Sequence, residues 1–357
     1  MNDNNDANEG RRSFLNNVGG LAIGGLVGPA LMGAKTAKPD ATAAGMSNEY
    51  NERTAQRSLD ALESAYGVHK GQRRNHTKGI GIVGHFTGTP EAQKYSQSLL
   101  FRGTPTEVIG RFSLAGGDPE SADTERSARG VGLQFRLSDG SLQHMTMLHT
   151  PMFFATMPQT FIDKFFALTP DPKTGKPDPA VFQKFVSTHP DNAGQAHYLG
   201  THNPTASYGN CPFFGIHTFY FVNRNGDRTM VRWRFEPRDG VVNLTDAELK
   251  TKGPNFLHEA LNERIKKGPI EWDMMVTLGE EGDSVTNPTV LWPASRREFR
   301  AGTLTIHSVM DQEVAPSYGI NYDPLVMAAG IEPSDDPILL FRSQSYGLSY
   351  SRRLRDV

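Results

Sequence analysis

The sequence predicts an α+β protein with an antiparallel β-barrel core, helices inserted between the strands and a helix at the C-terminal end. Short strand-like segments follow one another in hairpin order along the chain. Turn signals at Ser138-Asp139-Gly140 and at residues 223–227 join neighbouring segments. Longer segments with apolar residues at helical spacing interrupt and follow the strands.

The first predicted element is a helix at residues 49–66, where Leu59, Leu62 and Tyr66 recur at helical spacing. Strands are then predicted at residues 81–86, 108–114, 131–137 and 141–148. The last two are joined by the Ser138-Asp139-Gly140 turn, which favours an antiparallel pair.

Residues 158–187 are predicted to be helical around a central Pro- and Gly-containing loop. Strands are predicted again at residues 216–222, 229–235, 270–278 and 302–309, with a short helix near 256–266. The last element is predicted to be a helix over residues 323–348, in which Pro337 suits a first turn.

The composition is that of a globular protein, with 357 residues and a formal charge of -2. A chain without a basic excess is not expected to bind nucleic acid. The single cysteine, Cys211, has no partner for an internal disulfide, and its apolar neighbours predict a buried thiol.

The N-terminal residues predict an export signal. Arg11-Arg12 precedes a weakly hydrophobic, glycine-rich run from Val18 to Ala34, which is typical of a Tat signal peptide. A transmembrane anchor is the alternative, but the run is short and Pro29 interrupts it. We therefore expect a Tat-type signal peptide and linker at residues 1–43, a folded domain at 44–357, and a periplasmic protein that uses the Tat export machinery.

Several short blocks of residues occur in a fixed order. They are Arg73-x-x-His76-x-Lys78-Gly79, Arg111-Phe112-Ser113, Ser121-Ala122-Asp123-Thr124 with Arg129-Gly130, Thr150-Pro151-x-Phe153-Phe154, Asp336-Pro337 and Arg342-x-x-x-Tyr346. In this order and spacing the chain resembles the haem catalase family, and most of all its short members, the catalase-related peroxidases. The resemblance implies a catalase-like fold without the C-terminal helical domain of large catalases, and haem b with its iron as cofactor.

On one side of the haem, the resemblance implies that Tyr346 is the ligand of the iron. Arg342 precedes it by four residues, which in a helix places the guanidinium on the same face as the phenol. A positive charge beside the oxygen favours the phenolate, which is the form that binds iron. His217 resembles a histidine that orients this arginine.

On the other side, the resemblance implies that His76 is the distal histidine. A neutral imidazole accepts a proton from one peroxide oxygen and returns it to the other, which prepares the O–O bond for cleavage. Ser113 resembles the serine that fixes the tautomer and ring angle of this histidine.

Other residues are implied to hold the haem. Arg73 and Arg111 match arginines that bind the propionates, with Arg353 as a further candidate. Phe153 and Phe161 are candidates to stack on the macrocycle or to form its wall, although packing in the core explains such aromatic residues nearly as well.

The chain departs from the family at His149, which we take to stand where the family has its distal asparagine before Thr150-Pro151. The change predicts weak catalase activity, because a second peroxide must be positioned closely to complete the catalase cycle. Ala115 and Ser127 replace a branched residue and an aspartate of the family's channel, which predicts a wider approach for organic substrates. A monomer or homodimer is expected, since the parts that entangle the large tetramers are not recognised.

The leading hypothesis is a haem peroxidase that reduces hydrogen peroxide or organic hydroperoxides with small organic electron donors. One alternative is a hydroperoxide-rearranging enzyme of the allene oxide synthase type. The other is a haem-binding protein without catalysis. The presence of both His76 and Ser113 argues against the last, because binding alone needs no proton shuttle.

Overall fold

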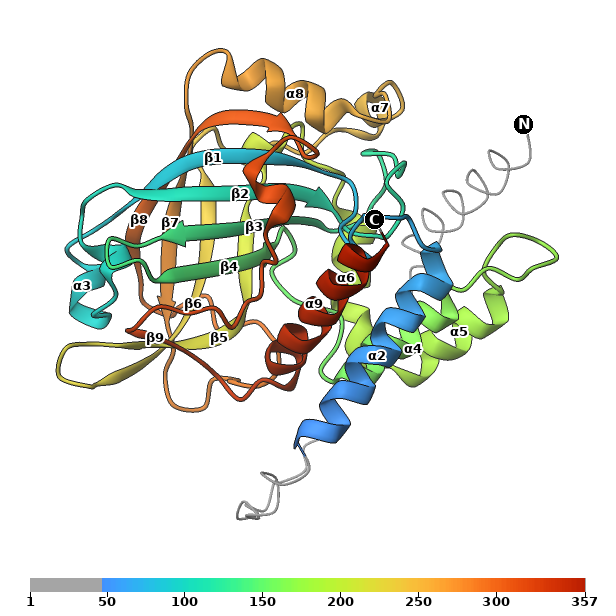
Figure 1. Cartoon of the computed structure of the whole chain (residues 1–357), viewed down its shortest axis with the longest axis horizontal. Coiled ribbons are helices and arrows are strands. Elements are labelled where there is room, and N and C mark those ends of the chain that lie inside the picture. Colours follow the sequence, from blue (N-terminus) through green and yellow to red (C-terminus); the bar gives the residue numbers. More distant parts are fainter. Residues whose placement is uncertain (1–46, 357) are drawn as a thin grey trace.

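The computed structural model describes residues 47–356 (Figure 1). The predicted signal peptide and linker at 1–43 lie outside the described residues. Within the described chain the strands form one nine-stranded antiparallel sheet in the order β4-β3-β2-β1-β8-β7-β6-β5-β9. A pairing between β4 and β5, at Leu148 and Phe214, closes the first eight strands into a barrel. The predicted fold class is confirmed.

The strands are β1 (Gly79–Gly88), β2 (Thr106–Leu114), β3 (Arg129–Arg136), β4 (Leu142–Leu148), β5 (Phe213–Val222), β6 (Arg228–Pro237), β7 (Ile270–Leu278), β8 (Glu298–Asp311) and β9 (Ile331–Pro333). The helices are α2 (Ser47–Tyr66), α3 (Ala92–Tyr95), α4 (Pro158–Ala167), α5 (Pro179–Thr188), α6 (Ala193–Thr201), α7 (Asp246–Leu249), α8 (Phe256–Ile265) and α9 (Pro337–Arg355). Among the described residues no helix is long and apolar enough to cross a membrane.

The barrel interior is an apolar core. Alternate residues of each strand point inward, among them Phe112, Phe235 and Trp272, which are at most 1% exposed. Phe112 stacks on Phe213 with ring centroids 5.4 Å apart. Because the interior is filled with side chains, a site for a large cofactor has to lie outside the barrel.

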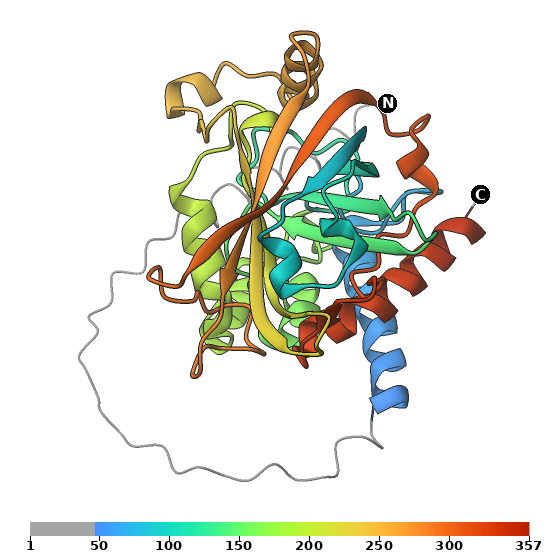
Figure 2. The same cartoon turned by 90° about the vertical axis from the view of Figure 1, so that its left-hand side faces the viewer.

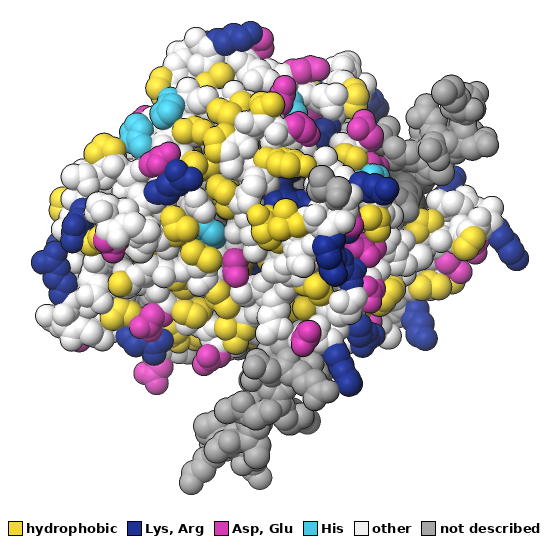
Figure 3. Space-filling model, in the orientation of Figure 1, with side chains coloured by type: hydrophobic (Ala, Val, Ile, Leu, Met, Phe, Trp, Pro, Cys, Tyr) yellow, Lys and Arg dark blue, Asp and Glu magenta, His cyan; other side chains and the backbone are white. Residues whose placement is uncertain are grey.

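A second core lies outside the barrel, where α2 packs against α4 and α9. Leu59 and Leu62 of α2, Phe165 of α4 and Ile338 of α9 belong to it. Figures 1 and 2 show α9 lying between the barrel and α2. Basic side chains gather along this edge of the surface (Figure 3). The last turn of α9 carries Arg352, Arg353 and Arg355, of which Arg353 is buried.

The predicted helix over residues 323–348 has to be corrected. The helix begins at Pro337 and runs to Arg355, whereas residues 323–336 form turns and β9. Gly330 has φ 90°, a conformation that a helix does not contain, and Pro333 lacks the N–H that a continuing helix needs. The shorter helices α3, α6 and α7 were not predicted.

The outer face of strands β2, β3 and β4, which points away from the barrel interior, carries several of the predicted site residues. Ser113, Gly130 and Leu148 are partners in register across the three strands, and so are Arg111, Gly132 and Thr146 in the next row. Partners in register point to the same side of a sheet. The two rows therefore present one surface, which faces α9.

Candidate functional site

A cavity lies between this surface and helices α2 and α9. Nine of the predicted site residues line it: Arg73, His76, Arg111, Ser113, Phe153, Phe161, Arg342, Tyr346 and Arg353. They come from segments up to 280 positions apart in the chain, from Arg73 to Arg353. The structure brings this predicted set together, but His217 and His149 lie outside the lining.

Tyr346 is held from its own helix. The Arg342 Nη2 donates a hydrogen bond to Tyr346 Oη at 3.1 Å, as the spacing of four residues predicted. The same nitrogen donates to Thr146 Oγ1 of β4 at 2.7 Å. Thr146 therefore ties the arginine to the barrel, a role that the sequence motifs did not indicate.

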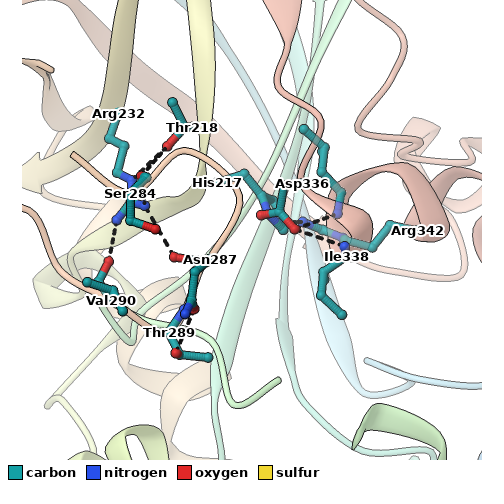
Figure 4. A network of polar contacts seen from close by, with 11 residues as sticks. His217, Thr218, Arg232, Ser284, Asn287, Thr289, Val290, Asp336, Ile338 and Arg342 are labelled. Carbon is teal, nitrogen blue, oxygen red and sulfur yellow. Dashed lines mark hydrogen bonds and ion pairs between the residues drawn. The ribbon is translucent and has the colours of Figure 1, made fainter. Parts of the chain in front are cut away.

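Behind Arg342 lies a buried polar network (Figure 4). Arg342 Nη1 is 2.9 Å from His217 Nε2, and His217 Nδ1 is 2.6 Å from Asp336 Oδ2. Since the arginine can only donate, Nε2 is the acceptor and Nδ1–H donates to the carboxylate. Burial lowers the pKa of His217 while Asp336 opposes that shift, so the neutral ring suits both contacts.

Asp336 also determines where α9 begins. Its Oδ1 accepts hydrogen bonds from the backbone N–H groups of Ile338 at 2.8 Å and Leu339 at 3.4 Å, and Pro337 occupies the first helical position. One carboxylate thus caps the helix and holds the histidine that supports Arg342. A chain of hydrogen bonds therefore links this cap through His217 and Arg342 to Tyr346.

His76 faces the cavity from the other side. It has φ 54°, the only positive value for a residue other than glycine among the described residues. Asn75 holds this strained backbone, because its Oδ1 accepts hydrogen bonds from the N–H groups of His76 and Gly116, both at 2.9 Å. Backbone strain of this kind is typical of functional positions.

The ring of His76 has a defined tautomer. Nδ1 is 3.0 Å from Ser113 Oγ, and the serine hydroxyl donates to Gly130 O at 3.5 Å. These contacts are both satisfied when Nδ1 carries the proton, which leaves Nε2 as an acceptor. Burial, followed by the charges of Arg111, Arg342 and Arg73, lowers the pKa of His76 from 6.5 to about 3. The imidazole is therefore neutral at physiological pH.

Three arginines give the cavity a strong positive character. Arg73, Arg111 and Arg353 have no carboxylate within ion-pair distance among the residues that the structure describes. Arg73 Nη2 donates to the backbone oxygens of residues 317, 318 and 320 at 3.0–3.3 Å, and Arg111 is held by Gln312 Oε1 and Thr77 O. Burial is the largest cause of the lowered pKa of each, which for Arg111 is about 10. Uncompensated guanidinium groups fit an anionic group such as a haem propionate.

The aromatic predictions divide between cavity and core. Phe153 and Phe161 line the cavity, but both also pack into the aromatic cluster of α4. The centroid of Phe161 is 4.7 Å from that of Phe165 and 6.0 Å from that of Phe341. Both residues therefore contribute to the core, and their contact with a haem macrocycle stays a prediction.

The expectation that His149 faces the distal side has to be corrected. His149 is not part of the cavity lining, and its Nδ1 accepts a hydrogen bond from the backbone N–H of Arg129 at 2.9 Å. Its pKa is lowered to about 3, mainly by burial, so its charge does not vary with pH in the physiological range. Leu148 is the residue that lines the cavity here. Strand alternation explains the difference, because adjacent residues point to opposite faces.

Comparison with known proteins identifies the family of this chain. The family model described as Catalase matches residues 69–356. A "Catalase-related peroxidase" of Synechococcus elongatus is 47% identical over 304 residues, covering 85% of this chain and 90% of its own length. A protein of the same description from Mycolicibacterium paratuberculosis is 30% identical over 301 residues, covering 84% and 95%.

A solved structure agrees in fold. A fungal catalase is similar with a TM-score of 0.73 and 24% identity, and the likeness covers 91% of this chain and 66% of that protein. The smaller chain thus corresponds to about two thirds of the fungal enzyme. With the matching family model, the relatives and the shared fold, the chain belongs to the catalase family, whose members are haem-dependent oxidoreductases.

Proposed function

We propose that this protein is a haem peroxidase that reduces hydrogen peroxide or an organic hydroperoxide with small organic electron donors, and that its catalase activity is weak. The observation that carries the proposal is the pairing of a neutral His76, whose Nε2 is unpaired among the described residues, with Tyr346 held by Arg342 in the same cavity. A haem-binding protein without catalysis has no need of a base held in one tautomer.

The residues divide the work. Tyr346 would hold the haem iron, and Arg73, Arg111 and Arg353 would bind its carboxylates. Haem b, which needs no covalent attachment, suits a cavity whose described lining includes no cysteine. Bound haem supplies the redox chemistry, passing two electrons to the peroxide and receiving two from the donors.

His76 moves the proton. Nε2 accepts the hydroxyl proton of the peroxide and returns it to the oxygen that leaves, while Ser113 keeps the ring at one angle. The low pKa of His76 keeps Nε2 free to accept at neutral pH. We attribute the proposed weak catalase activity to Leu148, an apolar residue of the cavity lining, because His149 lies outside that lining.

Two substitutions test the assignment by absorption spectroscopy. His76→Ala should keep bound haem but slow its oxidation by peroxide by about 10²-fold or more, the usual contribution of a positioned base. Tyr346→Phe should weaken haem retention. His307→Ala and Tyr220→Phe, which lie outside the cavity lining, serve as matched controls that should change neither property.

Each other outcome has its own meaning. Full peroxide turnover by His76→Ala would remove the base from the mechanism. Consumption of an organic hydroperoxide without consumption of donor would identify a rearrangement of the allene oxide synthase type. A haem-loaded protein that reacts with no peroxide would be a binding protein.

We also propose export by the Tat machinery to the periplasm, followed by function as a monomer or homodimer. The support for export is the twin arginine Arg11-Arg12 ahead of the Val18–Ala34 run. Arg11→Lys with Arg12→Lys should retain the protein in the cytoplasm, which cell fractionation measures. Sedimentation of the haem-loaded protein measures its assembly.

A further inference from the structure

Asn75 directly precedes His76 in the chain and lines the same cavity. Its Oδ1 accepts hydrogen bonds from the backbone N–H groups of His76 and Gly116, both at 2.9 Å. Gly116 belongs to the loop that follows β2, and its carbonyl oxygen accepts a hydrogen bond from the N–H of Thr77 at 3.0 Å. The amide of Asn75 is therefore held in one orientation by two segments of the chain.

These contacts also determine which end of the amide carries the hydrogens. Only the oxygen can accept from two N–H groups, and a flipped amide would place its own hydrogens against them. Nδ2 is therefore the donor end, and it has no hydrogen-bond partner among the residues that the structure describes. Because Asn75 is half-buried and lines the cavity, this donor can serve a bound ligand.

The polar groups around the base are engaged in other ways. Ser113 Oγ contacts His76 Nδ1 and a backbone oxygen of β3. Arg111 Nη2 donates to Gln312 Oε1 and to a backbone oxygen. His76 Nε2 carries no hydrogen in the neutral tautomer, so it accepts and does not donate. Asn75 Nδ2 is therefore a donor next to the base that the described part of the protein does not use.

We propose that Asn75 Nδ2 donates a hydrogen bond to the peroxide and stabilises the negative charge that develops when His76 takes its proton. The proposal rests on the proposed peroxidase function and concerns its first step, the cleavage of the O–O bond. His76 Nε2 accepts the hydroxyl proton and returns it to the oxygen that leaves, so the peroxide carries negative charge between the two transfers. A donor that is already held in place stabilises such charge without reorganisation.

The hydrogen bond leaves the overall reaction unchanged. One peroxide ROOH, in which R is hydrogen or an organic group, reacts with two donors that each lose a hydrogen atom. The O–O bond breaks, and the products are ROH, one water molecule and two donor radicals. The amide of Asn75 gives up no proton in this reaction, so its effect is on the rate and not on the products.

Fluoride is the probe, because this anion binds ferric haem and accepts hydrogen bonds but does not react further. Asn75→Asp keeps an acceptor oxygen for both backbone N–H groups and replaces the Nδ2 donor by a second oxygen. Titration of the haem-loaded protein should show about tenfold weaker fluoride affinity, the effect of one hydrogen bond to a charged group. Stopped-flow absorption should show about 10²-fold slower haem oxidation by peroxide, the usual effect of removing one fixed donor.

Two further variants separate the donor from other effects. Asn321→Asp places the same negative charge on the lining of the cavity but keeps Asn75, so it should weaken fluoride binding much less. Asn75→Ala removes both ends of the amide without adding charge and should also weaken fluoride binding. It should in addition lower the urea midpoint of unfolding, which Asn75→Asp should keep, because two backbone N–H groups lose their acceptor.

The proposal fails if Asn75→Ala binds fluoride as tightly as the wild type. It also fails if Asn321→Asp loses as much affinity as Asn75→Asp, because charge alone would then explain the loss. Fluoride binding needs no turnover, so these outcomes do not depend on the peroxidase function. A wild type that binds fluoride through Asn75 but reacts with no peroxide would reject that function while supporting the donor position of Asn75.

Discussion

At the scale of single residues, Gly130 leaves the space that the imidazole ring of His76 occupies. A Cβ at this position would lie 2.9 Å from His76 Cε1, 3.0 Å from its Nδ1 and 3.2 Å from Ser113 Oγ. Each of these distances is tighter than ordinary van der Waals contact. Because Gly130 of β3 has no side chain, His76 and Ser113 can approach each other closely enough to form a hydrogen bond.

Gly130→Ala should push the imidazole away from Ser113 and slow haem oxidation by peroxide at least tenfold, while haem stays bound through Tyr346. Stopped-flow absorption measures the rate and the haem spectrum reports occupancy. Gly194→Ala is the matched control, because its Cβ would meet only Met152 Cγ at 3.8 Å. An unchanged rate in Gly130→Ala would show that the ring position tolerates more freedom than this packing indicates.

Most of the site residues that the sequence predicted do line the cavity, but the sequence did not predict which residue of Leu148-His149 faces it. A histidine in a motif indicates a functional position because its ring can carry a proton, whereas a leucine gives no such indication. The predicted strand at 141–148 already contained the signal, since alternation places neighbours on opposite faces. The face itself depends on register with β3, which pairs residues distant in sequence, so a local pattern did not decide it.

At the scale of elements, the start of α9 links helix stability to the site. Asp336 caps the helix through Oδ1 and holds His217 through Oδ2. The helix α5 begins with a similar cap that, among the residues the structure describes, has no such second contact to a histidine. There Asp178 precedes Pro179, and its Oδ1 accepts a hydrogen bond from the backbone N–H of Ala180 at 2.8 Å.

Asp178→Ala should lower the free energy of unfolding by about 1 kcal/mol, the usual cost of a lost cap, and leave the haem spectrum unchanged. Asp336→Ala should cost about 2 kcal/mol or more, because it also leaves the buried Nδ1–H of His217 unpaired. It should further shift the haem absorption spectrum, since Arg342 loses its support. Urea unfolding and absorption spectra measure both effects, and identical spectra for the two variants would contradict the proposed link.

The helix and its motif were predicted correctly, but its beginning was predicted too early, at residue 323 instead of Pro337. Asp336-Pro337 is a helix-start signal, but the apolar residues upstream of it also favour a helix and predict one segment over residues 323–348. The segment before Asp336 instead pairs as β9 with β5, which lies more than a hundred positions earlier. Pairing with a distant strand overrides a local periodicity.

At the scale of the whole molecule, buried neutral histidines couple stability to pH. His76 and His149 each have a pKa of about 3 in the folded chain, against an ordinary value of 6.5. Between these values the unfolded chain binds the protons and the folded chain does not. The stability that these two neutral histidines contribute is therefore fully present above pH 6.5 and is lost as the pH falls toward 3.

The free energy of unfolding should decrease by about 1.4 kcal/mol per pH unit for each of these histidines below pH 6.5. His149→Asn retains an acceptor for the Arg129 N–H but does not titrate, so its slope should be smaller by about that amount. Urea unfolding at several pH values between 4 and 8 measures the slopes. Equal slopes for the wild type and His149→Asn would mean that the pKa of His149 is the same in the folded and the unfolded chain.

The pairing between β4 and β5 involves a residue that serves both the closure of the barrel and the wall of the cavity. Leu148 pairs with Phe214 to close the barrel, and the same leucine lines the cavity beside His76. These partners are 66 positions apart in the chain, and contacts between distant residues form slowly during folding. We therefore expect the part of the cavity wall that Leu148 forms to be complete only when the barrel has closed.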